Sequence, residues 1–350
     1  MIRIPAFARA VRTRRVSVAL RGTARGGSMI ALSAAALGII QFYHPSHPAP
    51  TAPFANLGQH INAGAPINAF GTSREVRVRF ALPGDVVDFP LEVSGDPTAL
   101  SYTWIAVRDS TVADSVRPIV GSSFAVPSAP GFYRLAILRG LERQVIPEPT
   151  LAVMVPFARR VGGMLNGYRI GTYVADRLSH DHPDGFVEVG TQDVDLRVST
   201  HLRLGDFLTH DAQAEVWPKY VALNPRLLDK LELVLAKIGA GARLARKDDA
   251  PQDVAFDVHS GFRTPAHNAG VWRAARDSRH QYGDAADLAI DANGDGRVTL
   301  IDQLLVARAV DQVELEHPEL VGGLGLYTSR NYSTPYVHID ARGTRMRWKG

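Results

Sequence analysis

The chain has 350 residues, of which 45% are hydrophobic and 21% charged, a composition typical of a globular protein with about two domains. It contains no cysteine, which excludes disulfide bonds and thiolate metal sites. The formal net charge is +4, but seven arginines lie within the first 25 residues, and the other 32 basic and 35 acidic residues leave a charge of −3. The basic balance therefore does not indicate nucleic-acid binding, and we expect no nucleic-acid partner.

The amino end has the pattern of an export signal. Its arginines precede and flank a short apolar stretch at residues 29–40. A basic region before such a stretch is typical of a secretory signal, and the stretch is short for a spanning helix, which needs about 20 apolar residues. Extended to Tyr43, it is alternatively an uncleaved membrane anchor with its basic side in the cytoplasm. We therefore expect residues 1–43 to direct the chain to the periplasm or cell envelope, either cleaved or attached to the inner membrane.

Two different patterns follow in the first half. Residues 44–74 are rich in Pro, Ala, Gly and Asn, which predicts a semi-extended linker or mobile tether. From Glu75 onward, apolar and polar residues alternate as in half-buried strands. Strands are predicted at residues 75–82, 86–93, 101–107, 131–138 and 151–155. Their spacing predicts that residues 75–157 form a small all-β, antiparallel, immunoglobulin-like sandwich with Trp104 in its core, a spacer or a wall-facing binding module.

The second half mixes helices and strands. Asn224 and Pro225 are a good N-cap and first-turn pair, and they predict a core helix with an apolar stripe that ends at Gly239 or Gly241. A strand is predicted at residues 254–259. Pro265 then predicts the start of a helix through about Asp277.

Two stretches near the carboxyl end carry residues suited to a metal ion. His280 and Asp287 are separated by a segment with Gly283 and two alanines, which lets the backbone turn so that both side chains converge. His338 and Asp340 lie two residues apart in an apolar, β-rich run, so they point to the same side of a strand. Two histidines and one carboxylate, with an open fourth position, are the ligand set of a catalytic zinc site. We therefore predict that His280, Asp287 and His338 bind Zn²⁺.

These stretches also resemble a known family. The pattern SxHxxGxAxD at residues 278–287, followed by HxD at 338–340, is similar to the zinc D-Ala-D-Ala carboxypeptidases and related peptidoglycan peptidases of the M15 family. Further similar segments are residues 260–268 (the family's SGYRxPxxN), 322–327 and 347–348. The resemblance covers roughly residues 160–350. It implies an α+β fold, M15/hedgehog-like, in which an antiparallel sheet bears the metal ligands and helices cover one side.

The resemblance also implies roles for other residues. Arg263 matches a family arginine that holds the substrate or its developing oxyanion, a task suited to its planar fork. A zinc-bound water still needs a general base, and no acidic residue lies between Leu324 and His338. Asp340 is the predicted base and Asp284 the alternative. Many family members have a second His in place of Asp340, so a further alternative is that His338 and Asp340 exchange the roles of ligand and base.

A second metal motif occupies residues 291–302. It places oxygen ligands at loop positions 1, 3, 5, 7 and 12, the seventh through a backbone carbonyl: Asp291, Asn293, Asp295, Arg297 and Asp302. Gly296 at position 6 completes the EF-hand calcium pattern, which resembles the single loops of dockerin modules, and a helical stretch follows. We predict a structural Ca²⁺ that braces the zinc site through the nearby Asp287.

Together these features predict an exported hydrolase. We expect residues 158–350 to be a zinc peptidase domain that cleaves peptide bonds in peptidoglycan stem peptides or cross-links, as a D-Ala-D-Ala carboxypeptidase or an endopeptidase. One alternative is a non-catalytic cell-wall-binding module that retains the fold and the metal. Another is a calcium-dependent scaffold built on the sandwich, in which the zinc site is incidental.

Overall fold

The computed structural model describes residues 70–89, 99–174, 182–245, 255–328 and 334–350. All of these belong to one unit, Thr51–Gly350. The predicted export segment and the linker up to residue 69 lie outside the described residues. Within the described ranges, no helix is both long and apolar enough to span a membrane.

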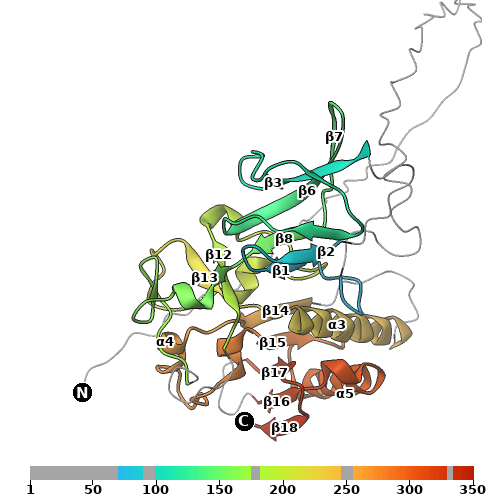
Figure 1. The fold of residues 1–350 in the computed structure, drawn as a ribbon. Coiled ribbons are helices and arrows are strands. Elements are labelled where there is room, and N and C mark those ends of the chain that lie inside the picture. Colours follow the sequence, from blue (N-terminus) through green and yellow to red (C-terminus); the bar gives the residue numbers. More distant parts are fainter. Residues whose placement is uncertain (1–69, 90–98, 175–181, 246–254, 329–333) are drawn as a thin grey trace, which may run out of the picture. The chain divides into compact units, whose positions relative to one another are not determined.

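The first half consists of β-structure (Figure 1). A six-stranded sheet has the order β1-β8-β6-β3-β4, with β7 beside β6. Its strands are β1 (Val78–Ala81), β3 (Ser101–Ala106), β4 (Arg117–Pro118), β6 (Gly131–Arg139), β7 (Glu142–Val145) and β8 (Thr150–Val153). A separate pair comprises β2 (Val86–Asp88) and β5 (Ser123–Ala125). Trp104 is fully buried between the two sheets' side chains, packs edge-on against Phe89, and donates from Nε1 to the carbonyl of Ala125 at 2.7 Å.

One strand pair departs from the predicted antiparallel pattern. β1 and β8 pair in parallel, with Val78 opposite Thr150. These are the first and last strands of this half, and the long chain between them provides the crossover that a parallel pair requires. The immunoglobulin-like shape stays a prediction.

The last residues of the predicted linker are bound to the second half of the chain. The backbone N–H groups of Thr72 and Ser73 donate to the carboxylate of Asp229 at 2.8 and 2.7 Å. Gly71 has φ +84°, and a Cβ there would collide with the same carboxylate. Asp229 is buried, so its charge needs these donors, and they hold the chain from Phe70 onward against the second half.

Small elements connect the two halves. A three-stranded sheet and a two-stranded hairpin alternate with 3₁₀ turns: β9 (Val155–Pro156), η2 (Phe157–Arg159), β10 (Met164–Leu165), β11 (Tyr168–Arg169), β12 (Gly185–Val189), η3 (Thr191–Asp193), η4 (Leu204–Phe207) and β13 (Lys219–Val221). The larger hydrophobic cluster includes Val78 and Phe132 from the first half together with Leu288 and Ile339 from the second. A second cluster, around Trp104, belongs to the first half alone.

Two helix predictions were wrong at their ends. α3 (Pro225–Ala245) begins at the predicted position but continues past both glycines. The residues around those glycines are mostly alanine and leucine, whose helix propensity offsets a cost of about 1 kcal/mol per glycine. α4 (Pro265–Asn268) ends after one turn, although a helix was predicted to about Asp277.

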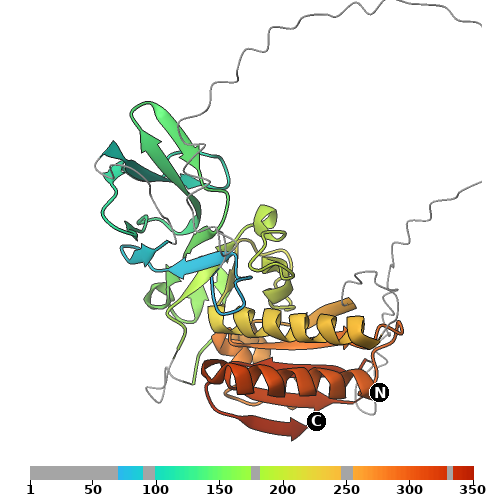
Figure 2. The ribbon, with the colours of Figure 1, turned by 90° about the vertical axis from the view of Figure 1, so that its right-hand side faces the viewer.

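The second half is built on a five-stranded sheet of order β14-β15-β17-β16-β18. The elements are β14 (Ala255–Ser260), η5 (Arg279–Tyr282), β15 (Ala285–Asp291), α5 (Leu300–Glu316), η6 (Pro318–Leu320), β16 (Gly323–Tyr327), β17 (Tyr336–Asp340) and β18 (Met346–Lys349). All pairs are antiparallel except β16 with β18. α3 and α5 lie side by side along one face of the sheet, where α5 contacts β15, β16 and β17 (Figure 2).

A buried ion pair ties these helices to the sheet. Lys230 on α3 is fully buried and donates from Nζ to Glu314 Oε1 on α5 at 2.8 Å. The same Nζ donates to the backbone carbonyl of Asp340 on β17 at 2.7 Å. Burial lowers the pKa of Lys230, and Glu314 opposes that shift. The pair fixes the end of β17, which carries two of the predicted site residues.

Candidate metal centre

Three elements bring the predicted zinc ligands together. Asp287 on β15 and His338 on β17 stand directly opposite each other in the antiparallel register, so both side chains project from the same face. His280 lies in η5, immediately before β15. Gly283 turns the chain between them with φ +70°, and a Cβ there would collide with the carbonyl of Ala222. Only glycine fits this turn without strain.

The three ligand atoms form a compact triangle. His280 Nε2 lies 3.2 Å from Asp287 Oδ1 and 3.1 Å from His338 Nδ1, and the latter two atoms are 2.9 Å apart. Tetrahedral ligands at about 2.0–2.1 Å from zinc lie about 3.3–3.4 Å from one another, so small adjustments would admit the ion. All three residues are buried, at 2, 4 and 6% exposure. Within the described ranges, this is the group of three histidine or acidic side chains whose ligand atoms lie within 4.8 Å of one another.

Hydrogen bonds set the tautomer of each imidazole. His280 Nδ1 lies 2.7 Å from the carbonyl of Gly261, which only accepts, so Nδ1 carries the proton and Nε2 presents its lone pair. His338 Nε2 lies 3.1 Å from Asp340 Oδ2, so Nε2 donates and Nδ1 presents its lone pair. Two nitrogen lone pairs and a carboxylate oxygen then face one another, and only a proton or a metal cation between them makes this arrangement favourable. The donor set therefore fits a divalent cation.

The electrostatics agree with that arrangement. Burial lowers the pKa of His280 and so favours its neutral, ligating form. Burial alone would raise the pKa of Asp287, but His280 and His338 outweigh it and hold that pKa well below its ordinary value. Burial also lowers the pKa of His338, but hydrogen bonds to Asp287 and Asp340 reverse the effect and raise it.

Asp340 lies in a different place from that expected of the base. Its fully buried carboxylate accepts from the N–H of Gly323 at 2.7 Å and from Arg342 Nε at 2.9 Å, besides His338. Burial would raise its pKa, yet these donors hold the pKa far below the ordinary value. The carboxylate contacts the His338 nitrogen that faces away from Asp287. A base must reach the ligand side of the imidazole, so this position favours an orienting role for Asp340, and its role as the base stays a prediction.

The alternative assignments of the base also stay predictions. Asp284 is buried and accepts two hydrogen bonds from Arg279 Nε, at 3.1 and 3.0 Å. Burial is the main cause of its raised pKa. For the exchange of roles between His338 and Asp340, the structure shows that His338 Nδ1 is the atom that lies next to His280 Nε2 and Asp287 Oδ1.

Arg263 contacts a ligand in the structure. Its Nη2 forms an ion pair with Asp287 Oδ2, and its Nε donates to Ser260 Oγ at 2.7 Å. The guanidinium therefore holds the carboxylate oxygen that does not face the histidines. Sequence reasoning missed this contact, and it also missed the Gly261 carbonyl and Arg342, whose roles follow only from strand pairing.

A cavity of about 520 Å³ opens beside the triangle and is lined by all three ligand residues. Aromatic side chains form much of its wall. Tyr327 and Tyr336 stack with centroids 4.6 Å apart, Trp348 Nε1 donates to the Tyr327 hydroxyl at 2.9 Å, and Trp272 also lines the cavity. We call this cavity the metal-site pocket.

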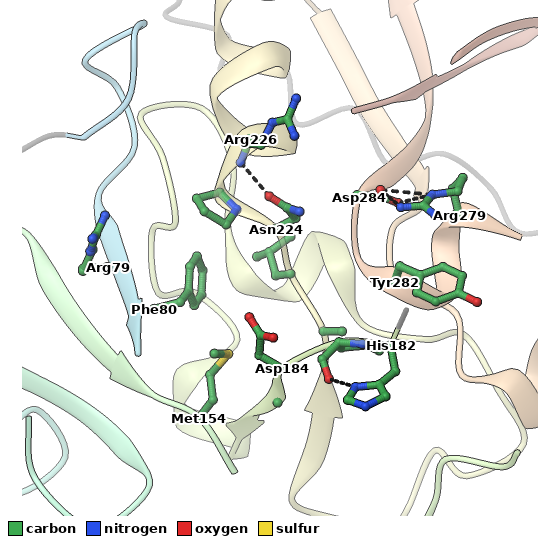
Figure 3. Close-up of a pocket in the computed structure, with 15 residues that line it drawn as sticks. Arg79, Phe80, Met154, His182, Asp184, Asn224, Arg226, Arg279, Tyr282 and Asp284 are labelled. Carbon is green, nitrogen blue, oxygen red and sulfur yellow. Dashed lines mark hydrogen bonds and ion pairs between the residues drawn. The ribbon is translucent and has the colours of Figure 1, made fainter. Parts of the chain in front are cut away.

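A second cavity of about 520 Å³ lies between β1, β12, the start of α3 and η5. Figure 3 shows Asp284 paired with Arg279 at one side of it, with Asn224 and Asp184 at other parts of the wall. None of the three ligand residues lines it. Arg279 lines both cavities.

Within the predicted calcium loop, the acidic side chains accept hydrogen bonds from the loop's own backbone N–H groups. The carboxylate of Asp291, at the end of β15, accepts from the N–H groups of Asp295 and Gly296 at 3.1 and 2.8 Å. Asp302, fully buried in the first turn of α5, accepts from the N–H groups of Asn293 and Thr299 at 3.1 and 2.7 Å. The Arg297 N–H donates to Asp295 Oδ1 at 2.9 Å. Calcium binding stays a prediction.

Comparison with known proteins adds no family to these observations, since the chain matches no family model and no curated protein.

Proposed function

We propose that the chain is a zinc-dependent peptidase that acts on peptidoglycan stem peptides or cross-links. One observation carries this proposal: His280 Nε2, Asp287 Oδ1 and His338 Nδ1 converge within 3.2 Å at the wall of an open pocket. The substrate class rests on the resemblance of the same segments to the M15 peptidases. Export to the cell envelope, through residues 1–43, is part of the same proposal.

Each residue has a role under this proposal. The three ligands would hold Zn²⁺, which when bound supplies an activated water and polarises the scissile carbonyl. Asp340 and the Gly261 carbonyl keep the two imidazoles in the ligating tautomer. Arg263 holds the second oxygen of Asp287 and, because it also lines the pocket, is close to the bound substrate.

We assign the proton-accepting role to Asp277 in place of Asp340. In the part of the chain that the structure describes, Asp277 and Asp287 are the acidic side chains that line the metal-site pocket, and Asp287 is a proposed ligand. Asp277 is exposed, and its Oδ1 accepts a hydrogen bond from the Tyr282 hydroxyl, which holds the carboxylate in place. A carboxylate at the pocket wall can take a proton from water and pass it to the leaving amine.

A structural Ca²⁺ in the loop from Asp291 to Asp302 is a second part of the proposal. β15 carries both Asp287 and Asp291. An ion that orders the end of β15 would therefore also stiffen the strand that carries the zinc ligand. The loop's oxygen ligands and its closing Asp suit calcium.

The direct test is the zinc content of the purified protein together with turnover of defined muropeptides. One zinc per chain and hydrolysis of a stem-peptide or cross-link bond would support the proposal. Zinc binding without hydrolysis would favour the alternative, a cell-wall-binding module that retains the metal. Hydrolysis that persists after complete removal of the metal would refute it.

A further inference from the structure

Among the described residues, four arginines line the metal-site pocket, and three of them are neutralised. Each of the three forms an ion pair with a buried aspartate: Arg263 with Asp287, Arg279 with Asp284, and Arg342 with Asp340. The charges of these three arginines are therefore largely neutralised by the protein's own aspartates and are less available to an anionic ligand.

Arg273 is different from the other three. Within the described ranges, no acidic side chain forms an ion pair with it. Its guanidinium lies 4.3 Å from the ring centroid of Trp272, a side chain that is 67% exposed and also lines the pocket. Stacking uses the face of the guanidinium and leaves the N–H groups in its plane available, the edge that binds a carboxylate.

The backbone around Arg273 holds it in an unusual conformation. Arg273 has φ +57°, a left-handed value that costs a non-glycine residue energy and concentrates at binding sites. The buried side chain of Asn268 stabilises the loop, because its Nδ2 donates to the carbonyl of Ala275 at 2.9 Å. This bond ties the chain before Arg273 to the chain after it, where the sequence predicted a helix.

We propose that Arg273, stacked on Trp272, binds a free carboxylate of the peptide substrate next to the bond at the metal. This inference rests on the proposed function and narrows it: the preferred substrates are peptides with a carboxylate near the scissile bond. The planar guanidinium can donate two parallel hydrogen bonds to the two oxygens of a planar carboxylate.

The test measures binding separately from hydrolysis. Zinc-loaded protein is titrated by calorimetry with an analogue of diacetyl-Lys-D-Ala-D-Ala in which a ketomethylene group replaces the scissile amide, so that it cannot be hydrolysed, and with the C-terminal amide of the same analogue. We expect the wild-type protein to bind the acid about 10- to 100-fold more tightly, as for one charge-assisted interaction. Arg273→Gln should abolish this preference, and Arg273→Lys should restore part of it, while zinc content stays unchanged.

The matched control is Arg276→Gln. Arg276 belongs to the same loop and loses the same charge, but it lines a neighbouring cavity rather than the metal-site pocket. It should keep the wild-type preference. Equal or absent binding of the two peptides by the wild-type protein, or a preference that survives Arg273→Gln, overturns the inference. A preference that depends on Arg273 without any hydrolysis overturns only the peptidase assignment and leaves the carboxylate site standing.

Discussion

Replacing Asp340 by asparagine tests whether this carboxylate orients His338 or accepts a proton during the reaction. Every partner of the carboxylate is a donor: the Gly323 N–H at 2.7 Å, Arg342 Nε at 2.9 Å and His338 Nε2 at 3.1 Å. An amide has one accepting oxygen and one donating nitrogen. In Asp340→Asn, the new amide nitrogen therefore faces a group that is itself a donor, and the hydrogen bond on that side is lost.

The size of the effect depends on which of these partners faces the amide nitrogen. If the amide nitrogen faces His338, the imidazole must move its proton to Nδ1, the atom that points to Asp287, and this atom can no longer bind a metal. Loss of such an orienting partner costs about 10- to 100-fold in metal affinity, or about 1.4–2.7 kcal/mol. If the nitrogen instead faces Gly323 and Arg342, the protein loses about 1–3 kcal/mol of stability.

The assay is a zinc titration against a competing chelator, with circular dichroism as a check of folding. We expect Asp340→Asn to bind zinc about 10- to 100-fold more weakly, and saturating zinc to restore most of its turnover. Asp311→Asn is the control, because Asp311 also accepts from two arginines but does not line the metal-site pocket. Wild-type zinc affinity with turnover reduced about 100-fold or more would refute the reasoning and make Asp340 the base.

Four further predictions follow. His280→Ala should lose both zinc and activity, because it removes one of three ligands, as measured by metal analysis and muropeptide turnover. Asp277→Asn should keep zinc but lower kcat about 100-fold or more; an unchanged kcat would remove Asp277 as the proton acceptor. Millimolar calcium should raise the Tm of the wild-type protein by mass action but not that of Asp295→Ala, and no shift in either would leave the loop without calcium. Gly283→Ala should lower the Tm, because its Cβ would collide with the carbonyl of Ala222; an unchanged Tm would contradict the close approach of these two segments.

The convergence of the metal ligands could be predicted because it depends on short-range rules. Strand parity places His338 and Asp340 on one side, and a glycine turn brings His280 back toward Asp287. The strand at 254–259 and the start of the helix at Pro225 follow from similarly local signals.

The role of Asp340 could not be predicted in this way. Parity shows that Asp340 shares a face with His338, but it does not show which imidazole nitrogen the carboxylate meets. That depends on Gly323, which reaches Asp340 only because β16 pairs with β17, and on Arg342. The short α4 is a similar case. A loop stands in place of the rest of the predicted helix, and the buried Asn268 side chain stabilises it through a hydrogen bond to the carbonyl of Ala275.

Because Asp287 pairs directly with His338, the metal centre forms only when β15 and β17 pair in the correct register. A slip of one residue between β15 and β17 would turn the two side chains to opposite faces of the sheet. Misregistered chains would then lack the site altogether and gain nothing from the ion. Zinc at 100 times its dissociation constant would favour the correctly paired chain by about 2.7 kcal/mol. Zinc present during folding would thus favour chains with the correct strand register, before any substrate binds.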